Sequence, residues 1–114
     1  IFAGAPRPAP IVVSMMERHP LGSQAFMPLS DHDWLVVVAP TNADDSAPDF
    51  DGLRCFQVRG DQGVRYAPNV WHHPLLVCQQ QDFLIADRAG PDGELASVNL
   101  QEHWEDAPVA VIKL

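Results

Sequence analysis

The stretch Glu17-Arg18-His19-Pro20-Leu21-Gly22-Ser23-Gln24 decides the fold of this chain. The β-branched and Met-rich residues 11–19 predict a strand, which Pro20 and Gly22 end, and residues 24–28 predict a second strand. Alternation along the first strand predicts two faces, one with Val13, Met15, Glu17 and His19 and the other with Ser14, Met16 and Arg18. The turn between the strands therefore brings a carboxylate, an imidazole and the Gln24 amide toward one point inside a sheet or barrel.

The rest of the chain is a series of short strands separated by turn residues. Further strands are expected at residues 34–39, 53–58, 64–66, 75–79 and 82–88, the first of them fully buried. Gly60-Asp61-Gln62-Gly63 is a turn and predicts a hairpin between residues 53–58 and 64–66. Residues 41–52 are polar and acidic and predict a mobile loop. Its Asp residues lack the Gly-centred pattern of a calcium-binding loop, so we expect them to be solvated. The tail from Glu94 to Leu114 has an ambiguous pattern. Short strands at this spacing predict an all-β sandwich or barrel.

Composition limits the class of protein. With 114 residues and 46% hydrophobic content, the whole of residues 1–114 should form a single domain. A net charge of −8 with only seven Lys and Arg residues argues against nucleic acid as a partner. The longest apolar runs, residues 34–40 and 74–78, are far shorter than the roughly 20 residues of a membrane span. Cys55 and Cys78 lack disulfide or metal spacing, which predicts two buried thiols in a cytoplasmic protein.

Imidazoles come from a second segment, Pro68-Asn69-Val70-Trp71-His72-His73-Pro74. Adjacent residues of a strand point to opposite faces, so at most one of His72 and His73 faces inward. Burying Glu17 and His19 without partners would cost several kcal/mol each. An interior that holds these groups therefore requires water, a metal or a ligand.

The two segments resemble the two motifs of the cupins, a family of small β-barrels. Glu17-x-His19 followed by a spacer of four residues and Gln24 is similar to the first motif, with Glu for His and Gln for Glu. Gly63, Pro68 and His73 are similar to the second motif, and this spacing favours His73 over His72 as the inward imidazole. A closer resemblance, over roughly residues 11 to 90, is to the ureidoglycolate lyase family; it rests on the blocks Met16–Leu29, Val36–Ala39, Gly63–Tyr66, Asn69–Leu75 and Asp82–Arg88.

The resemblance implies a cupin-like β-barrel, a jelly roll of antiparallel strands, in a cytoplasmic homodimer. It implies a carbon–nitrogen lyase that splits (S)-ureidoglycolate into glyoxylate and urea in allantoin breakdown, with a divalent metal, nickel, and no organic cofactor. The family has an additional N-terminal portion, and because the chain begins at Ile1 with Met15 as its first Met, we expect that portion to be missing.

Site residues follow from the two motifs and from chemistry. His73, His19 and Glu17 are the candidate catalytic groups, and Glu17, His19, Gln24 and His73 are the candidate metal ligands. Without a metal, His73 or Glu17 would be the base and His19 a donor to the substrate. The candidate substrate-binding residues are Gln24, Tyr66, Arg88 and Phe26. A neutral Gln ligand weakens the case for tight metal binding.

Each assignment has a structural alternative. Phe26, Trp34 and Trp71 also suit a core, Tyr66 could simply pack, and Arg88 could be a solvated strand end. Arg18 should lie opposite Glu17 as an outer-face or dimer-contact charge. Two other functions remain open: a non-catalytic cupin-like module that binds a small carboxylate such as glyoxylate, and a metal-dependent isomerase or dioxygenase, against which the missing His of the first motif counts.

Overall fold

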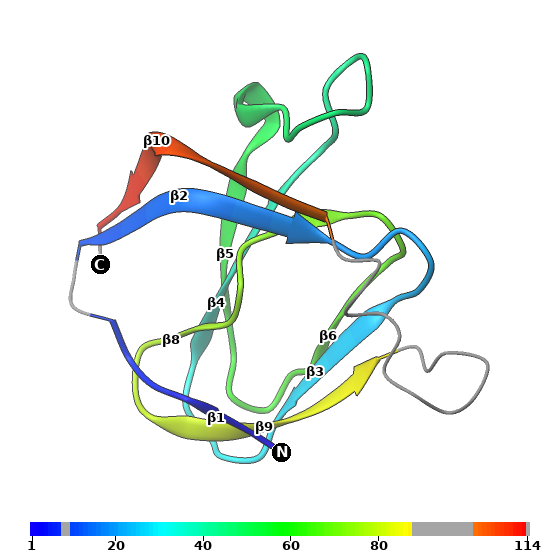
Figure 1. Cartoon of the computed structure of the whole chain (residues 1–114). Coiled ribbons are helices and arrows are strands. Elements are labelled where there is room, and N and C mark those ends of the chain that lie inside the picture. Colours follow the sequence, from blue (N-terminus) through cyan, green and yellow to red (C-terminus); the bar gives the residue numbers. More distant parts are fainter. Residues whose placement is uncertain (8–9, 88–101, 114) are drawn as a thin grey trace.

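The chain forms two antiparallel sheets in the computed structural model, which describes residues 1–7, 10–87 and 102–113 (Figure 1). The four-stranded sheet has the order β1 (Phe2–Gly4), β9 (Gln81–Asp87), β3 (Gln24–Pro28) and β6 (Val64–Tyr66). The six-stranded sheet has the order β10 (Glu102–Ile112), β2 (Ile11–Arg18), β7 (Trp71–His72), β4 (Trp34–Ala39) and β5 (Arg54–Val58), and β8 (Leu76–Val77) also pairs with β4. The described part contains no α-helix, so the predicted all-β, cupin-like fold is confirmed.

The interior between the sheets is apolar. Phe26 and Phe83 of the four-stranded sheet pack against Trp34 and Val36 of β4, and Tyr66 belongs to the same cluster. Trp34 and Phe83 meet edge to face with ring centroids 5.0 Å apart. Alternation along β4 therefore gives the barrel its inner core, as the buried run at residues 34–39 predicted.

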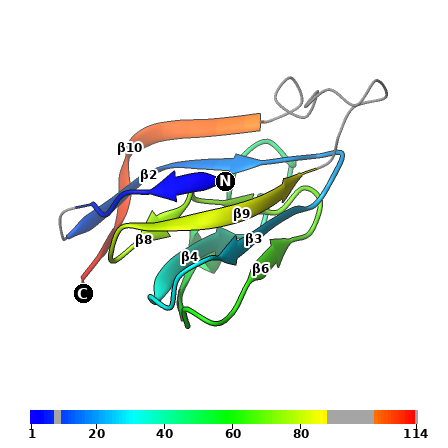
Figure 2. The same cartoon turned by 90° about the horizontal axis from the view of Figure 1, so that it is seen from below.

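A second apolar cluster lies on the other face of β4. Leu35, Val37 and Ala39 pack there with Trp71 and Met16. The 3-10 turn η1 (Phe50–Gly52) and β10 contribute partly buried side chains, and β10 lies beside β2 in both views (Figures 1 and 2). β4 is thus buried on both faces.

The expected two faces of β2 hold only at its C-terminal end. Val13 lies in the same cluster as Met16, not on the face of Glu17, so the prediction for Val13 was wrong. The pairing of β2 with β10 shifts register at this point, where Glu105 lies across Met15 and Ala110 lies across Val13. Such an irregularity breaks the alternation of side chains.

The hairpin expected between residues 53–58 and 64–66 does not form. β5 pairs with β4 and β6 pairs with β3, so the turn at Gly60 passes the chain from one sheet to the other. A cavity of about 510 Å³ lies between these two strands, with Val36, Phe56 and Tyr66 in its wall. The pairing partners on the far sides of β5 and β6 therefore override the local turn signal.

Two further features concern the chain as a whole. In the part of the chain that the structure describes, no helix has the length and apolar character needed to cross a membrane. Cys55 and Cys78 are both exposed free cysteines, which corrects the expectation of buried thiols. Cys55 lies on β5, an edge strand of its sheet, in which the residues from Arg54 to Gln57 are all exposed.

Candidate functional site

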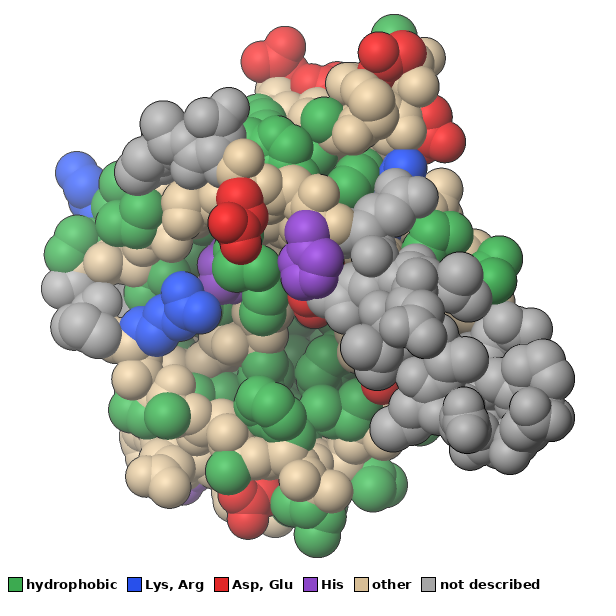
Figure 3. All heavy atoms as spheres, viewed as in Figure 1, with side chains coloured by type: hydrophobic (Ala, Val, Ile, Leu, Met, Phe, Trp, Pro, Cys, Tyr) green, Lys and Arg blue, Asp and Glu red, His purple; other side chains and the backbone are tan. Residues whose placement is uncertain are grey.

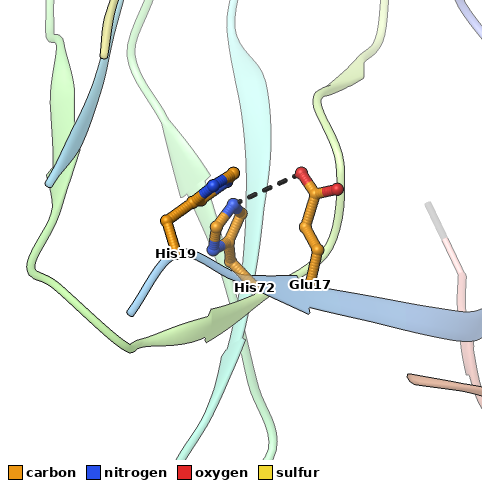
Figure 4. A group of neighbouring side chains, drawn as sticks. All are labelled: Glu17, His19 and His72. Carbon is orange, nitrogen blue, oxygen red and sulfur yellow. Dashed lines mark ion pairs between the residues drawn. The ribbon is translucent and has the colours of Figure 1, made fainter. Parts of the chain in front are cut away.

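Glu17 and His72 face each other across neighbouring strands. Glu17 is the penultimate residue of β2, and it pairs directly with His72 of the two-residue strand β7. His19 follows the end of β2, and Figure 4 shows the Glu17, His19 and His72 side chains converging on one point. The Glu17 Oε1 to His72 Nε2 distance is 3.5 Å.

Strands of the other sheet supply the remaining polar groups. Gln24 opens β3, and its Oε1 lies 3.1 Å from His72 Nε2. Tyr66 ends β6 directly opposite Gln24, and its ring stacks on the His72 imidazole with centroids 4.1 Å apart and planes 10° from parallel. Phe26 packs edge-on against Tyr66, which places it in the wall of the site. On the face shown in Figure 3, histidine, acidic and basic side chains gather around a hollow with an apolar floor.

The hydrogen bonds of His72 constrain its protonation. Its Nδ1 lies 3.0 Å from the Val70 carbonyl oxygen, and because a carbonyl only accepts, Nδ1 carries a hydrogen and donates. Nε2 then faces Glu17, and also Gln24. A protonated ring donates from Nε2 to the Gln24 and Glu17 oxygens, which ties His72 to β3 and to β2. A neutral ring with its hydrogen on Nδ1 accepts at Nε2 only from the Gln24 amide nitrogen, which requires the amide to be turned over.

Burial and mutual charge shift the pKa values of these groups. Desolvation raises the pKa of Glu17, but the hydrogen bond and charge of His72, with the charges of His19 and His103, outweigh it and hold that pKa below its usual value. Burial, reinforced by the charge of His72, lowers the pKa of His19 despite the opposing effect of Glu17. Burial, together with the Glu17 charge, raises the pKa of Tyr66. At neutral pH the site therefore holds an ionised carboxylate beside a neutral His19 and a protonated phenol.

The same three residues could hold a metal ion. Glu17, His19 and His72 each offer one ligand atom, and these atoms all lie within 4.8 Å of one another. Two imidazoles and a carboxylate form a common donor set for divalent transition metals. The His72 Nδ1 hydrogen bond to Val70 orients the ring as in many metal sites, and His19 Nε2 is buried with no partner among the described residues. The donor set therefore fits a metal.

His73, favoured over His72 on motif spacing, is not part of this cluster. Its Nδ1 donates to the Pro74 carbonyl oxygen at 2.8 Å, and its backbone N–H donates to Val37. His72 takes the inward position because it lies directly across from both Glu17 and Val38 in the ladder. The structure thus places His72, and not His73, with Glu17, His19 and Gln24.

The arginine predictions have two outcomes. Arg18 lies on the face opposite Glu17, as predicted. The outer-face assignment required a surface position, but Arg18 is buried against Trp71. Arg88, the candidate anchor for a substrate carboxylate, lies outside the described residues. Asp87, which the sequence argument did not single out, pairs with Gln24 in the ladder, and its charge partly opposes the lowering of the His19 pKa. Its register with Gln24 is set by the fold and has no local sequence signal.

Together, the two sheets and this cluster define a small cupin-like barrel with a half-buried carboxylate–imidazole site able to hold a metal ion. Residues 1–112 match the family model described as Ureidoglycolate lyase, and the chain belongs to that family. The resemblance seen in the sequence is therefore confirmed.

Individual relatives agree with the family match. The chain is 47% identical over 115 residues to "Ureidoglycolate lyase" of Burkholderia mallei (strain NCTC 10229), a match that covers 97% of the chain and 65% of that protein. It is 48% identical over 112 residues to the protein of the same name from Agrobacterium fabrum, covering 97% of the chain and 62% of the relative. The Brucella ovis protein of that name is 52% identical over 105 residues, covering 91% of the chain and 57% of the relative. The chain thus spans less than two thirds of the length of these curated relatives.

Proposed function

We propose that this chain forms the catalytic barrel of a ureidoglycolate lyase, which cleaves (S)-ureidoglycolate to glyoxylate and urea in allantoin breakdown. The observation that carries the proposal is the pairing of Glu17 with the buried His72, with His19 beside them, at a half-buried point between the sheets. The proposal extends to a homodimer that acts in the cytoplasm and to nickel as the metal.

The reaction requires one proton to move from oxygen to nitrogen. The reacting carbon of the substrate carries a hydroxyl, a carboxylate and the ureido nitrogen. As a base removes the hydroxyl proton, the oxygen forms a C=O double bond and the C–N bond breaks. The C–N electron pair stays on the urea nitrogen, which takes up a proton, so that glyoxylate and urea form without consuming water.

Glu17 suits the proton transfer, and His19 suits a hydrogen bond to the leaving group. Glu17 has a lowered pKa and is ionised at neutral pH, so it can accept the hydroxyl proton with the oxygen that does not face His72 and pass that proton to the urea nitrogen. His19 has a lowered pKa and is neutral, so a ring N–H can donate a hydrogen bond to the departing urea. A divalent cation at Glu17, His19 and His72 would acidify the substrate hydroxyl.

The other residues orient these groups. His72 holds Glu17 through its Nε2, and the stacked Tyr66 ring and the Gln24 amide hold His72. Gln24 and Tyr66 also present polar atoms that suit the ureido group, and Phe26 closes the wall behind them. We assign substrate binding to these three residues.

The decisive experiment measures urea and glyoxylate released from each enantiomer of ureidoglycolate. We expect turnover of the S enantiomer, and Glu17→Gln and His72→Asn should each lower kcat by about 100- to 10,000-fold. His32→Asn, a histidine in the turn before β4, is the matched control. Loss of turnover on chelation with recovery on adding nickel would assign the metal to the reaction.

A negative result would point to a different class of protein. If neither enantiomer is turned over with or without nickel, the lyase proposal fails. Calorimetric titration with glyoxylate would then test the non-catalytic module that binds a small carboxylate. Binding weakened by His72→Asn would place that ligand at the same site.

A further inference from the structure

Arg18 is an unusual charged residue for the end of a strand, because only 4% of its surface is exposed. It follows Glu17 on β2 and points to the opposite face of the sheet, where its guanidinium lies 4.4 Å from the centre of the Trp71 ring. Trp71 in turn precedes His72 on β7. Glu17 and His72 thus meet on one face of this strand pair, while Arg18 and Trp71 meet on the other.

The loop after β4 closes over the Arg18 guanidinium. Nη1 donates to Asp45 Oδ1 at 2.6 Å and to Thr41 Oγ1 at 3.4 Å, and Nη2 donates to the Asp45 carbonyl oxygen at 2.9 Å. Asp45 itself adopts a left-handed backbone with φ of 58°, which turns both its side chain and its carbonyl toward Arg18. The acidic loop expected to be solvated is therefore attached to β2.

The strand that carries His72 is too short for its own backbone hydrogen bonds to fix its position. β7 consists of Trp71 and His72 alone, inserted between β2 and β4. A strand of two residues makes few ladder hydrogen bonds, so its register depends on side-chain contacts with its neighbours. The stack of Arg18 on Trp71 is one such contact, and it lies directly behind the Glu17–His72 pair.

We propose that Arg18, clasped by Asp45, is a positioning residue that fixes the distance and orientation of Glu17 relative to His72. This role rests on the proposed lyase function for its effect on turnover, but its effect on His72 is independent of that function. Arg is suited to it because a planar guanidinium can stack on an aromatic ring and donate in two directions at once, which Lys cannot do.

The first test is Arg18→Lys, which keeps the charge and removes the fork and the stack. We expect kcat to fall about 10- to 100-fold with little change in KM, because a misplacement of about 1 Å in a reacting group has that scale of effect. The second readout is the imidazole ¹H–¹⁵N NMR spectrum of the metal-free protein, in which the His72 ring signals, assigned with His72→Asn, should shift.

Two control variants separate positioning from general stability. Arg59→Lys alters an exposed Arg–Asp pair, with Arg59 Nε 3.0 Å from Asp61 Oδ1, and should change neither kcat nor the His72 signals. Val13→Ala removes a fully buried side chain from the Arg18 side of β2, and should lower the Tm while leaving the His72 signals in place. If Arg18→Lys does not fold, Asp45→Asn serves instead, since the Asp45 side chain is 61% exposed and its change should shift the same signals less.

The outcomes decide the proposal in each case. Unchanged His72 signals in Arg18→Lys, or in Asp45→Asn where that variant stands in, would overturn it, as would an equal shift in Val13→Ala. Shifted His72 signals together with a lower kcat would support it. If the parent protein has no lyase activity, the proposed function fails, and the His72 signals alone decide whether Arg18 positions that ring.

Discussion

Acidification should destabilise the metal-free protein in two stages, and His73 provides the sharpest test. Its side chain is 3% exposed, its Nδ1 is committed to the Pro74 carbonyl, and its Nε2 is buried with no partner in the described part of the chain. Burial lowers the pKa of His73 from its usual 6.5; the charges of Arg7 and His72 act in the same direction, while the Pro74 hydrogen bond and Glu17 oppose them. The folded protein therefore keeps His73 neutral at a pH where the unfolded chain binds a proton.

The sign and size of the effect follow from this difference. As the pH falls below 6.5, the unfolded state gains a proton on His73 before the folded state does, so the free energy of unfolding decreases until the lower, folded pKa is reached. One such proton corresponds to about 1.4 kcal/mol per pH unit, or a Tm decrease of about 5 °C per unit. His19 adds to this first stage because its pKa is also lowered from 6.5, and Glu17 begins a second stage below 4.5 for the same reason.

The assay is thermal unfolding followed by circular dichroism, in the presence of a chelator, from about pH 8 to about pH 4. His73→Asn should reduce the slope of Tm against pH between the unfolded and folded pKa values, whatever its effect on the Tm itself. His32→Asn is the control for removing a histidine. A slope that is the same with and without His73, or a protein that becomes more stable as the pH falls below 6.5, would refute the argument.

Three further predictions concern the barrel around the site. Tyr66→Phe should keep the ring stacked on His72 and preserve the fold, whereas Tyr66→Ala should lower the free energy of unfolding by about 3–5 kcal/mol; urea titration measures both. Gly60→Ala should lower the free energy of unfolding by about 1–3 kcal/mol, because the added Cβ would collide with the His32 backbone nitrogen, and a smaller decrease measured by urea titration would argue against a close approach. Phe83→Ala, at a position with 0% exposure, should cost about 3–5 kcal/mol by the same titration, while Leu84→Ala on the exposed face of β9 should have a far smaller effect.

Much of the fold could be predicted from local patterns, since most strands were located within a residue or two. The strands at Gln24–Pro28, Trp34–Ala39 and Val64–Tyr66 have the predicted bounds. The strands that were missed, β1 and β7, have three and two residues, and a strand of that length has no periodicity to detect. β10 has no clear signal in the sequence, because its pairing with β2 is irregular and joins residues far apart in the chain.

The residue types of the candidate site could be predicted from the sequence, but which of two neighbouring histidines joins it could not. Glu17, His19 and Gln24 converge because a short turn joins the strands that carry them, and a short turn can be recognised in the sequence. Whether His72 or His73 joins them depends on which residue lies across from Glu17, and that register is set by the neighbouring strands. Motif spacing pointed to His73, which the structure places outside the cluster of Glu17, His19 and His72, because β7 ends at His72 and the chain bends at Pro74.

The burial of Arg18 could not be predicted either, because it depends on a residue far away in the sequence. Alternation placed it opposite Glu17, and an arginine on the outer face of a barrel strand is ordinarily a solvated charge. Its burial depends on Asp45, 27 residues away, in an acidic loop whose composition suggested only solvation. A buried cation that stacks on Trp71 and is paired with a distant carboxylate would be costly to keep if the loop moved away. The loop, the back of β2 and the Glu17–His72 pair therefore form one connected unit. A change at Asp45 should alter the orientation of Glu17 relative to His72 on the other face of the sheet.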